Sequence, residues 1–210
     1  MKNLVIIFLA IVAVSCSSVS YKPLPYKDRI LVAVGEVDNQ TGNHLFDSVV
    51  SESTGNYIHH FHKTQCFRVI ERHRLSELLK EHRLSMTGLI DQSQGKRIGK
   101  ILGVDAILYL ALSSAKYNKN EQKAGSAISI EEKLSITVDA RLVTVETGEI
   151  LASAVFTTVE EAKVQAIGKG LSRGEPMDQL KAVREVVTVK APEYIADQMA
   201  SQVYKMSLVK

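Results

Sequence analysis

The stretch ISIEEKLSITVDARL, residues 128–142, alternates between apolar and polar side chains almost without interruption. Its even positions are Ile, Ile, Glu, Leu, Ile, Val, Ala and Leu, and its odd positions are all polar. Successive side chains of a β-strand point to opposite faces of a sheet. The pattern therefore predicts a strand with one buried face, on which Glu132 is the only charge. We place this strand at 134–146, and Thr147-Gly148 predicts a tight turn into a second strand at 149–159.

The rest of the chain alternates strands with helices. β-Branched runs predict strands at 29–37, 67–71 and 104–112, and helical periodicity predicts helices at 45–63, 73–84, 93–103 and 191–206. The chain has 210 residues, of which 45% are hydrophobic. The order β-α-β-α-α-β-β-β-α indicates the α/β class, leaning towards α+β, as one domain with helices packed on a mixed sheet. Leu78 and Ile107 are expected to share its core.

The N-terminus predicts export. Lys2 precedes an unbroken apolar run from Leu4 to Val14, which is shorter than the roughly 20 residues of a transmembrane helix and has the length of a signal-peptide core. The sequence AVSC that ends at Cys16 resembles a bacterial lipobox, although Leu is usual where Ala13 stands. A membrane anchor and an ordinary cleaved signal are the alternatives. We expect a signal peptide at 1–15, an acylated Cys16 with a tether at 16–28, and a domain at 29–206.

Charge and composition exclude some functions. The net charge is +3, and it falls to +2 when residues 1–15, which include Lys2 and no acid, are removed. That balance gives no indication of a basic stripe, so nucleic acid is not an expected partner. If Cys16 is acylated, Cys66 has no partner for an intramolecular disulfide, and its place before the strand-like FRVI predicts burial.

One cluster invites a metal site. His59, His62 and Cys66 fall at i, i+3 and i+7, so a helix would present all three on one face, and zinc accepts such ligands. No fourth ligand follows at the usual spacing, and Cys66 falls near the predicted helix end. We therefore prefer a histidine-rich, partly exposed helix face and expect neither a metal nor a cofactor.

No pattern indicates an enzyme. The neighbouring pairs Glu131-Glu132 and Glu160-Glu161 lie on predicted or adjoining strand segments, where adjacent side chains diverge rather than converge as an acid–base pair requires. The glycine-rich segment 168–176 lacks the P-loop spacing and is expected to be a flexible loop.

Three segments carry a family resemblance: FRVIERHRLSELLKEHRL (67–84), IGKILGVDAIL (98–108) and LVTVETGEILAS (142–153). In this order, behind a lipobox and a proline-bearing tether, they resemble the CsgG-like lipoproteins of curli secretion. The resemblance implies a lipid-anchored protein at the outer membrane that faces the periplasm and acts by protein contact, and it leaves a homo-oligomer open. Family members include subunits of a secretion channel and periplasmic activators of peptidoglycan synthases.

The segment AKYNKNEQKA, residues 115–124, bears on that choice. It would be the partner strand if 128–142 belonged to a membrane-crossing hairpin, but both of its faces are polar or charged, and one lysine at the bilayer midplane costs about 2–4 kcal/mol. Residues 159–187 form no better hairpin, and their second half, from Glu175, has a helical pattern. We therefore expect both stretches to stay in water and the protein to be an adaptor rather than a channel subunit.

The acylation of Cys16 is directly testable. Mass spectrometry of the membrane fraction should find a mature N-terminal peptide that begins with a diacyl- or triacyl-cysteine. Cys16→Ala should abolish the modification, whereas Cys66→Ala should leave it unchanged. A mature N-terminus at any other residue would contradict the prediction.

Overall fold

The computed structural model describes residues 21–70, 99–167 and 171–209. Its centre is a six-stranded sheet with the strand order β2-β1-β3-β4-β5-β6. The β2-β1-β3 pairs are parallel and the β3-β4-β5-β6 pairs are antiparallel, so the predicted mixed sheet is confirmed. The strands are β1 (Ile30–Asn39), β2 (Phe67–Val69), β3 (Ala106–Ala124), β4 (Ala127–Thr144), β5 (Ile150–Ile167) and β6 (Leu171–Arg173).

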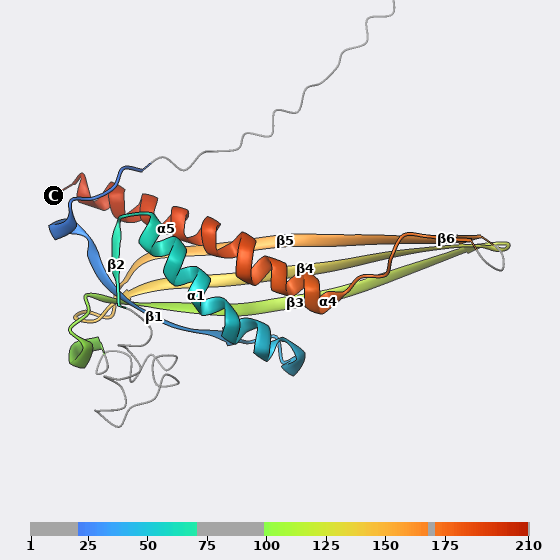
Figure 1. Cartoon of the computed structure of the whole chain (residues 1–210), viewed down its shortest axis with the longest axis horizontal. Helices are drawn as coiled ribbons and strands as arrows, with labels where there is room; N and C mark the ends of the chain where they lie inside the picture. The colour runs from blue at the N-terminus through green and yellow to red at the C-terminus, as the bar shows by residue number, and fades with distance from the viewer. Residues whose placement is uncertain (1–20, 71–98, 168–170, 210) are drawn as a thin grey trace, which may run out of the picture.

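The long helices lie together on one face of this sheet (Figure 1). They are α1 (Asp47–Lys63) and a continuous run of α4 (Gln179–Glu185), the π-helical turn η4 (Val186–Lys190) and α5 (Ala191–Ser207). Two short 3-10 turns, η1 (Tyr26–Asp28) and η2 (His44–Phe46), precede β1 and α1. The helices predicted at 45–63 and 191–206 are confirmed. Within the described part of the chain, none of the helices has the length and apolar character needed to span a membrane.

The main core lies between these helices and the sheet. Leu134, Ile136, Val138, Ala140 and Leu142 of β4 are all buried there, whereas the side chains between them point to the other face. This confirms the predicted one-sided burial of the strand. The helices contribute Val49, Tyr57, Phe61, Val187, Ile195 and Met199, among others. The register of β4 is consequently fixed by its apolar face, because a slip of one residue would expose all five side chains.

A smaller cluster occupies the opposite face of the sheet. It contains Ala33, Leu102, Val104, Ile107 and Val145. Residues 99–102 are helical and end the segment predicted as a helix at 93–103. The predicted helix 73–84 and its Leu78 lie outside the described residues, so only the burial of Ile107, which is 2% exposed, is established.

Three strands are longer than predicted. β3 was expected to end at Leu112 but reaches Ala124, β4 begins at Ala127, and β5 was expected to end at 159 but reaches Ile167. The added part of β3 is polar on both faces, so it carries no alternation that would announce a strand. The predicted loop 168–176 is also corrected, because Leu171–Arg173 forms β6 and pairs with β5.

The last residues of the expected tether are attached to the domain. The Tyr21 hydroxyl donates to Asp197 Oδ1 of α5 at 2.7 Å, and Leu24 is 6% exposed within the main core. The backbone N–H of Leu24 also donates to the carbonyl of Gln65. Cys66 lies beneath this segment and is fully buried, as predicted, and its burial raises the pKa of the thiol.

Ile107→Ala should lower the free energy of unfolding by about 2–5 kcal/mol, because it removes buried methyl groups and leaves a cavity in the smaller cluster. Val155→Ala is the control: Val155 is 55% exposed, and its truncation should change stability by no more than about 0.5 kcal/mol. Urea denaturation followed by circular dichroism measures both. Equal effects at the two positions would show that the assigned faces of the sheet are wrong.

Candidate functional site: the three-stranded arm

β3, β4 and β5 continue well past the helices as a narrow extension (Figure 1). We define the arm as residues 114–124, 127–137 and 157–167, which are paired in register from Ser114, Thr137 and Thr157 outwards. Eleven residues at about 3.3 Å each give a length of about 36 Å. The three parent strands have 19, 18 and 18 residues, far more than the usual maximum of about 10. Leu134 and Ile136 at the root of the arm still belong to the main core. The part of the arm from Glu132 to the tip is the feature of this fold that the core does not account for.

A tight turn closes the first hairpin at the tip. Ala124 pairs with Ala127, so the loop contains only Gly125 and Ser126. Gly125 has φ of 60°, a conformation that glycine adopts without the steric cost other residues meet. Such two-residue loops match the right-handed twist of the flanking strands, which keeps the long hairpin in register.

The outer face of the arm, directed away from the helices, is held by cross-strand polar pairs. Lys133 Nζ lies 2.6 Å from Glu161 Oε1, and Lys163 Nζ lies 2.7 Å from Glu131 Oε1. In each pair the two residues are directly opposite in the β4–β5 ladder. The hydrogen bond from Lys163 lowers the pKa of Glu131, and the one to Glu161 raises the pKa of Lys133. Each exposed pair adds little stability alone, but each favours this register over a slipped one.

The inner face carries one buried carboxylate at the root of the arm. Glu132 is 6% exposed. It accepts a hydrogen bond from the Tyr117 hydroxyl and another, at 2.6 Å, from the backbone N–H of Met177. Both hydrogen bonds lower the pKa of Glu132, and the one from Tyr117 has the larger effect. The single charge on the predicted apolar face thus fastens the segment before α4 to the middle strand.

Two further contacts join the arm root to the helices. Lys190 Nζ of η4 lies 2.7 Å from Glu160 Oε1 of β5 and 3.3 Å from Glu185 Oε1. The hydrogen bond to Glu160 is the main cause of the raised pKa of Lys190. The rings of Phe156 and Tyr194 pack at an interplanar angle of 58° with centroids 5.3 Å apart. Leu134 and Ile136 are buried in the main core at the same root, and towards the tip Ile128 and Ile130 belong to neither buried cluster.

Neighbouring carboxylates in the arm do not converge. Glu131 pairs on the outer face and Glu132 on the inner face, and likewise Glu161 and Glu160 bind lysines on opposite faces. The divergence predicted from the sequence is confirmed. These four side chains therefore act as separate structural contacts and do not form an acid–base pair.

One edge of the arm has open backbone groups. The pairing of β1 with β3 ends at Asn39 and Leu112, and among the described residues no strand lies beyond the outer edge of β3 from Ser113 to Ala124. A bulge at Ser113, whose hydroxyl donates to the Thr137 carbonyl at 3.3 Å, marks the point where this edge begins. Unpaired strand edges are sites where another chain can add a strand.

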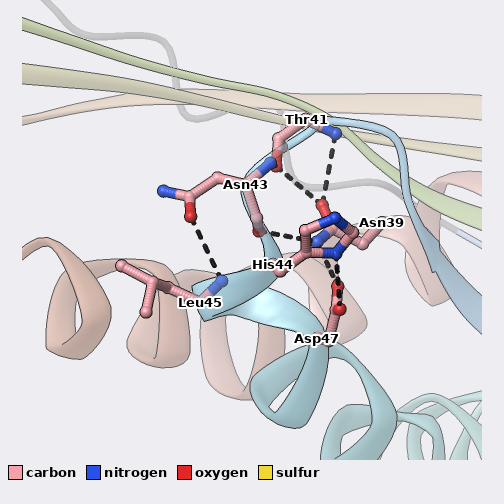
Figure 2. A network of polar contacts seen from close by, with 6 residues as sticks. All are labelled: Asn39, Thr41, Asn43, His44, Leu45 and Asp47. Atoms are coloured by element: carbon pink, nitrogen blue, oxygen red, sulfur yellow. Dashed lines mark hydrogen bonds and ion pairs between the residues drawn. The ribbon is translucent and has the colours of Figure 1, made fainter.

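A polar loop closes the end of β1 beside this edge (Figure 2). The Asn39 side-chain amide donates to the Asn43 carbonyl at 2.9 Å and to Asp47 Oδ1 at 2.5 Å, while its oxygen accepts from Thr41. Asn43 in turn accepts from the Leu45 N–H at the start of η2. The hydrogen bonds from Asn39 and then His44 lower the pKa of Asp47.

This loop is also bonded to the arm root, because the Gln40 N–H donates to the Leu112 carbonyl at 3.0 Å. Its side chains therefore stabilise the turn after β1 and the start of α1. The network ends β1 at the position where β3 becomes an edge strand.

The metal cluster considered from the sequence does not assemble. His59 and His62 are exposed on α1, whereas Cys66 is buried below the segment of Lys22, whose carbonyl lies 3.8 Å from its Sγ. No group of three or more His, Cys, Asp or Glu side chains in the described residues has the geometry of a metal site. Cys16, the predicted acylation site, lies outside the described residues.

With the fold and the arm established, the comparison with known families becomes informative. The family model of the curli production assembly/transport component CsgG matches residues 13–206. The chain belongs to the CsgG family. The match includes the mixed sheet, the helices and the whole arm, and it confirms the resemblance seen in the sequence. No curated protein matches the chain.

Three solved structures with similar arrangements are compared with this chain. The LpoB C-terminal domain from Escherichia coli is 21% identical, with 61% of this chain and 82% of that one covered and a TM-score of 0.43. Lipoprotein GNA1162 from Neisseria meningitidis is 14% identical over 77% and 96%, with a TM-score of 0.43. The PelC dodecamer from Paraburkholderia phytofirmans is 14% identical over 88% and 94%, with a TM-score of 0.38. These values are too low to transfer a property from any of them to this chain.

Sequence reasoning considered residues 115–124 only as half of a membrane hairpin. The structure does pair them with 127–136. The buried face of β4 lies under the helices as predicted for Leu134 to Leu142, but Ile128 and Ile130 lie farther out and belong to neither buried cluster. The sequence contained one sign of the longer strand: the alternation begins at residue 128, six residues before the predicted start of the strand at 134.

Glu132→Gln should destabilise the protein by about 1–3 kcal/mol, because two donors lose a charged acceptor. The pKa of Glu132 is lowered in the folded state, so its contribution is present above the ordinary carboxyl pKa and is lost as the pH falls through the lowered value. The difference between the wild type and the variant, measured by urea denaturation, should therefore shrink below about pH 4.

Glu131→Gln is the matched control, since the neighbouring carboxylate forms only an exposed pair with Lys163. Its effect should be much smaller than that of Glu132→Gln, because solvent screens an exposed pair. If the two variants lose the same stability at pH 7, Glu132 does not fasten the arm root.

Proposed function

We propose that this chain is a lipid-anchored, non-enzymatic assembly or regulatory protein of the bacterial envelope that acts through protein contacts made by the arm. It is held by acyl chains on Cys16 at the outer membrane and faces the periplasm. Membership of the CsgG family supports the envelope role, and the apolar run that ends at Ser15-Cys16 supports the anchor.

The open β3 edge of the arm is the observation that carries the proposal. Its backbone groups from Ser113 to Ala124 can add an extended strand of a partner, a mode in which main-chain hydrogen bonds provide affinity and flanking side chains provide specificity. Lys116, Lys119 and Lys123 along this strand are exposed. Charged edge residues disfavour indiscriminate pairing, so a partner strand that carries acidic side chains fits best.

The non-enzymatic assignment rests on what the polar side chains of the arm already do. On its inner face, Glu132 and Glu160 are committed to Met177 and Lys190, and Glu121 pairs with Lys123. Their outer neighbours Glu131 and Glu161 are bound to lysines. Groups engaged in this way hold the arm in place and are not arranged around a shared reacting atom.

A second candidate is a subunit of an oligomeric outer-membrane secretion channel. It is favoured by one observation: the β3–β4 and β5–β6 hairpins project from the same end of the domain, so copies could join through their arm edges. The inner face also contains Ile128, Ile130 and Val164. The same face carries Lys119 and Lys123, however, and a lysine in hydrocarbon costs about 2–4 kcal/mol near the midplane.

A photoreactive amino acid at Asn120, on the open edge, separates the two candidates in cells. We expect an adduct with a different protein, identified by mass spectrometry, and no adduct when the group is placed at the exposed Ser51 of α1. Adducts whose mass is a multiple of this chain alone would favour the channel.

Particle images of the detergent-extracted, lipidated protein provide an independent measurement. The adaptor predicts isolated elongated particles, and planar-bilayer recording should then show no stable conductance. Large rings with a central opening would contradict the adaptor and support the channel.

A further inference from the structure

The end of the domain opposite the arm carries a cluster of cationic side chains around an exposed tyrosine. Figure 1 shows η1 and the C-terminal end of α5 at this end, with the arm tip at the other. We name it the base surface and define it by the side chains of Lys22, Tyr26, Lys27, Arg29, Arg68 and Leu208, which line or border one cavity.

Two arginines are placed against the tyrosine ring. The Cζ atoms of Arg29 and Arg68 lie 5.8 Å and 5.3 Å from the centre of the Tyr26 ring. Arg29 Nε donates to the Leu24 carbonyl at 2.9 Å, and Arg68 Nε donates to the Arg29 carbonyl at 3.3 Å. The hydrogen bonds donated by Nε and the contacts with the Tyr26 ring hold both guanidinium groups in place. The remaining nitrogens of each guanidinium group stay available to a ligand.

No carboxylate of the described residues forms an ion pair with either arginine. This distinguishes the base surface from the arm, where Lys133 and Lys163 are both neutralised by glutamates. Arginine presents several donors in a planar fork that matches phosphate oxygens. The charge at the base surface is therefore suited to a phosphate group from outside the chain.

The cavity beside these groups is large and mixed in character. It has a volume of about 940 Å³, and its lining includes four basic side chains but only two acidic ones, Asp28 and Asp105. Asp105 is engaged, since its Oδ2 accepts the Leu31 N–H at 2.7 Å. Met206 and Leu208 of the C-terminal segment provide an apolar wall.

Exposed apolar side chains lie among these cations. Tyr26 and Leu208 are each 68% exposed. Aromatic rings at the level of lipid headgroups, with basic side chains around them, are typical of surfaces that rest on anionic membranes. A soluble phosphate would use the arginines but would leave Tyr26 and Leu208 in water.

The tether places a membrane within reach of this end. Tyr21 is fixed to α5 through Asp197, and five peptide units separate Tyr21 from Cys16. Fully extended, they span at most about 18 Å. The acyl chains must therefore enter a bilayer close to the domain, and the chain from Tyr21 to Arg29 leads directly to the base surface.

We infer that the base surface binds the phosphate groups of anionic phospholipids in the leaflet that holds the acyl chains of Cys16, so that the arm points away from that bilayer. This inference rests on the lipid anchor of the proposed function. It adds the ligand class and the orientation of the domain, which neither the anchor nor the arm determines.

Tryptophan fluorescence tests the orientation, because the natural chain contains no tryptophan. Tyr26→Trp places a single reporter in the base surface, and Ser126→Trp places one at the arm tip. Each acylated full-length variant is assembled into nanodiscs whose phospholipids carry brominated acyl chains, either phosphatidylglycerol or phosphatidylcholine. We expect phosphatidylglycerol to quench the emission of the Tyr26→Trp reporter and shift it to the blue, and to leave the Ser126→Trp reporter unchanged.

Charge variants then test the recognition. In the Tyr26→Trp background, Arg29→Gln with Arg68→Gln should reduce the quenching to the level seen in phosphatidylcholine, since each basic side chain near an anionic surface contributes about fivefold to binding. Arg173→Gln with Lys181→Gln removes the same charge from exposed positions outside both proposed surfaces and should leave the quenching unchanged. Lys22→Gln with Lys27→Gln replaces only exposed side chains of the base surface. It should also reduce the quenching, and it tests the recognition if the arginine variant does not fold.

Each of several results would overturn the inference. They are an unquenched Tyr26→Trp reporter, equal quenching in the two lipids, a quenched Ser126→Trp reporter, and an emission shift in detergent with inorganic phosphate alone. Mass spectrometry of Cys16 is performed on the same samples. Acylated protein with an unquenched base reporter contradicts this inference only, whereas protein without acyl chains contradicts the anchor itself.

Discussion

The pairing of β4 with β3 and β5 along its whole length is the interaction on which the rest of the structure depends. One half of β4 is buried beneath the helices from Leu134 to Leu142, and this apolar face fixes the register of the strand. The same register continues into the other half, whose apolar side chains Ile128 and Ile130 belong to neither buried cluster. There it brings Glu131 opposite Lys163 and Lys133 opposite Glu161. The core therefore determines the geometry of an arm of which it buries only the root.

The two ends of the domain are chemically different. Charges of both signs are paired across the arm, and the backbone of its β3 edge is open. At the base, by contrast, arginines without carboxylate partners among the described residues surround an exposed tyrosine. A strand edge with open backbone groups suits recognition of another polypeptide. A cationic surface whose arginines have no such carboxylate partners suits phosphate groups. With the proposed lipid anchor, the base would lie at the membrane and the arm would be presented to a partner.

Much of the fold was predictable because its signals are local. The alternation in β4 and the apolar stripe of the C-terminal helix each follow from side-chain periodicity within one segment. The hairpin through Thr147-Gly148 was also predicted, although its loop runs from 145 to 149 and is longer than the expected tight turn. The family also followed from ordered motifs, and the model match over residues 13–206 confirms it. The arm was missed in residues 115–124, since a strand that is polar on both faces has no periodicity to detect and forms only because β4 pairs with it. Helical spacing alone would place Cys66 beside His59 and His62, but the chain leaves α1 before Cys66 and buries it, as its position near the predicted helix end and before the strand-like FRVI indicated.

The sequence by itself determined the class of the domain, the buried face of its central strand, the divergence of Glu131 from Glu132 and the family. Each of these depends on residue types and spacing within local segments, or on the order of such segments along the chain. Only the tertiary structure decided that β3, β4 and β5 extend together as an arm, that Glu132 joins the middle strand to Met177, and that Arg29 and Arg68 meet at one tyrosine. Arg29 and Arg68 are 39 positions apart in the chain, and Glu132 and Met177 are 45 positions apart. Such contacts are created by the pairing of strands and the packing of helices, and no local pattern of side chains encodes them.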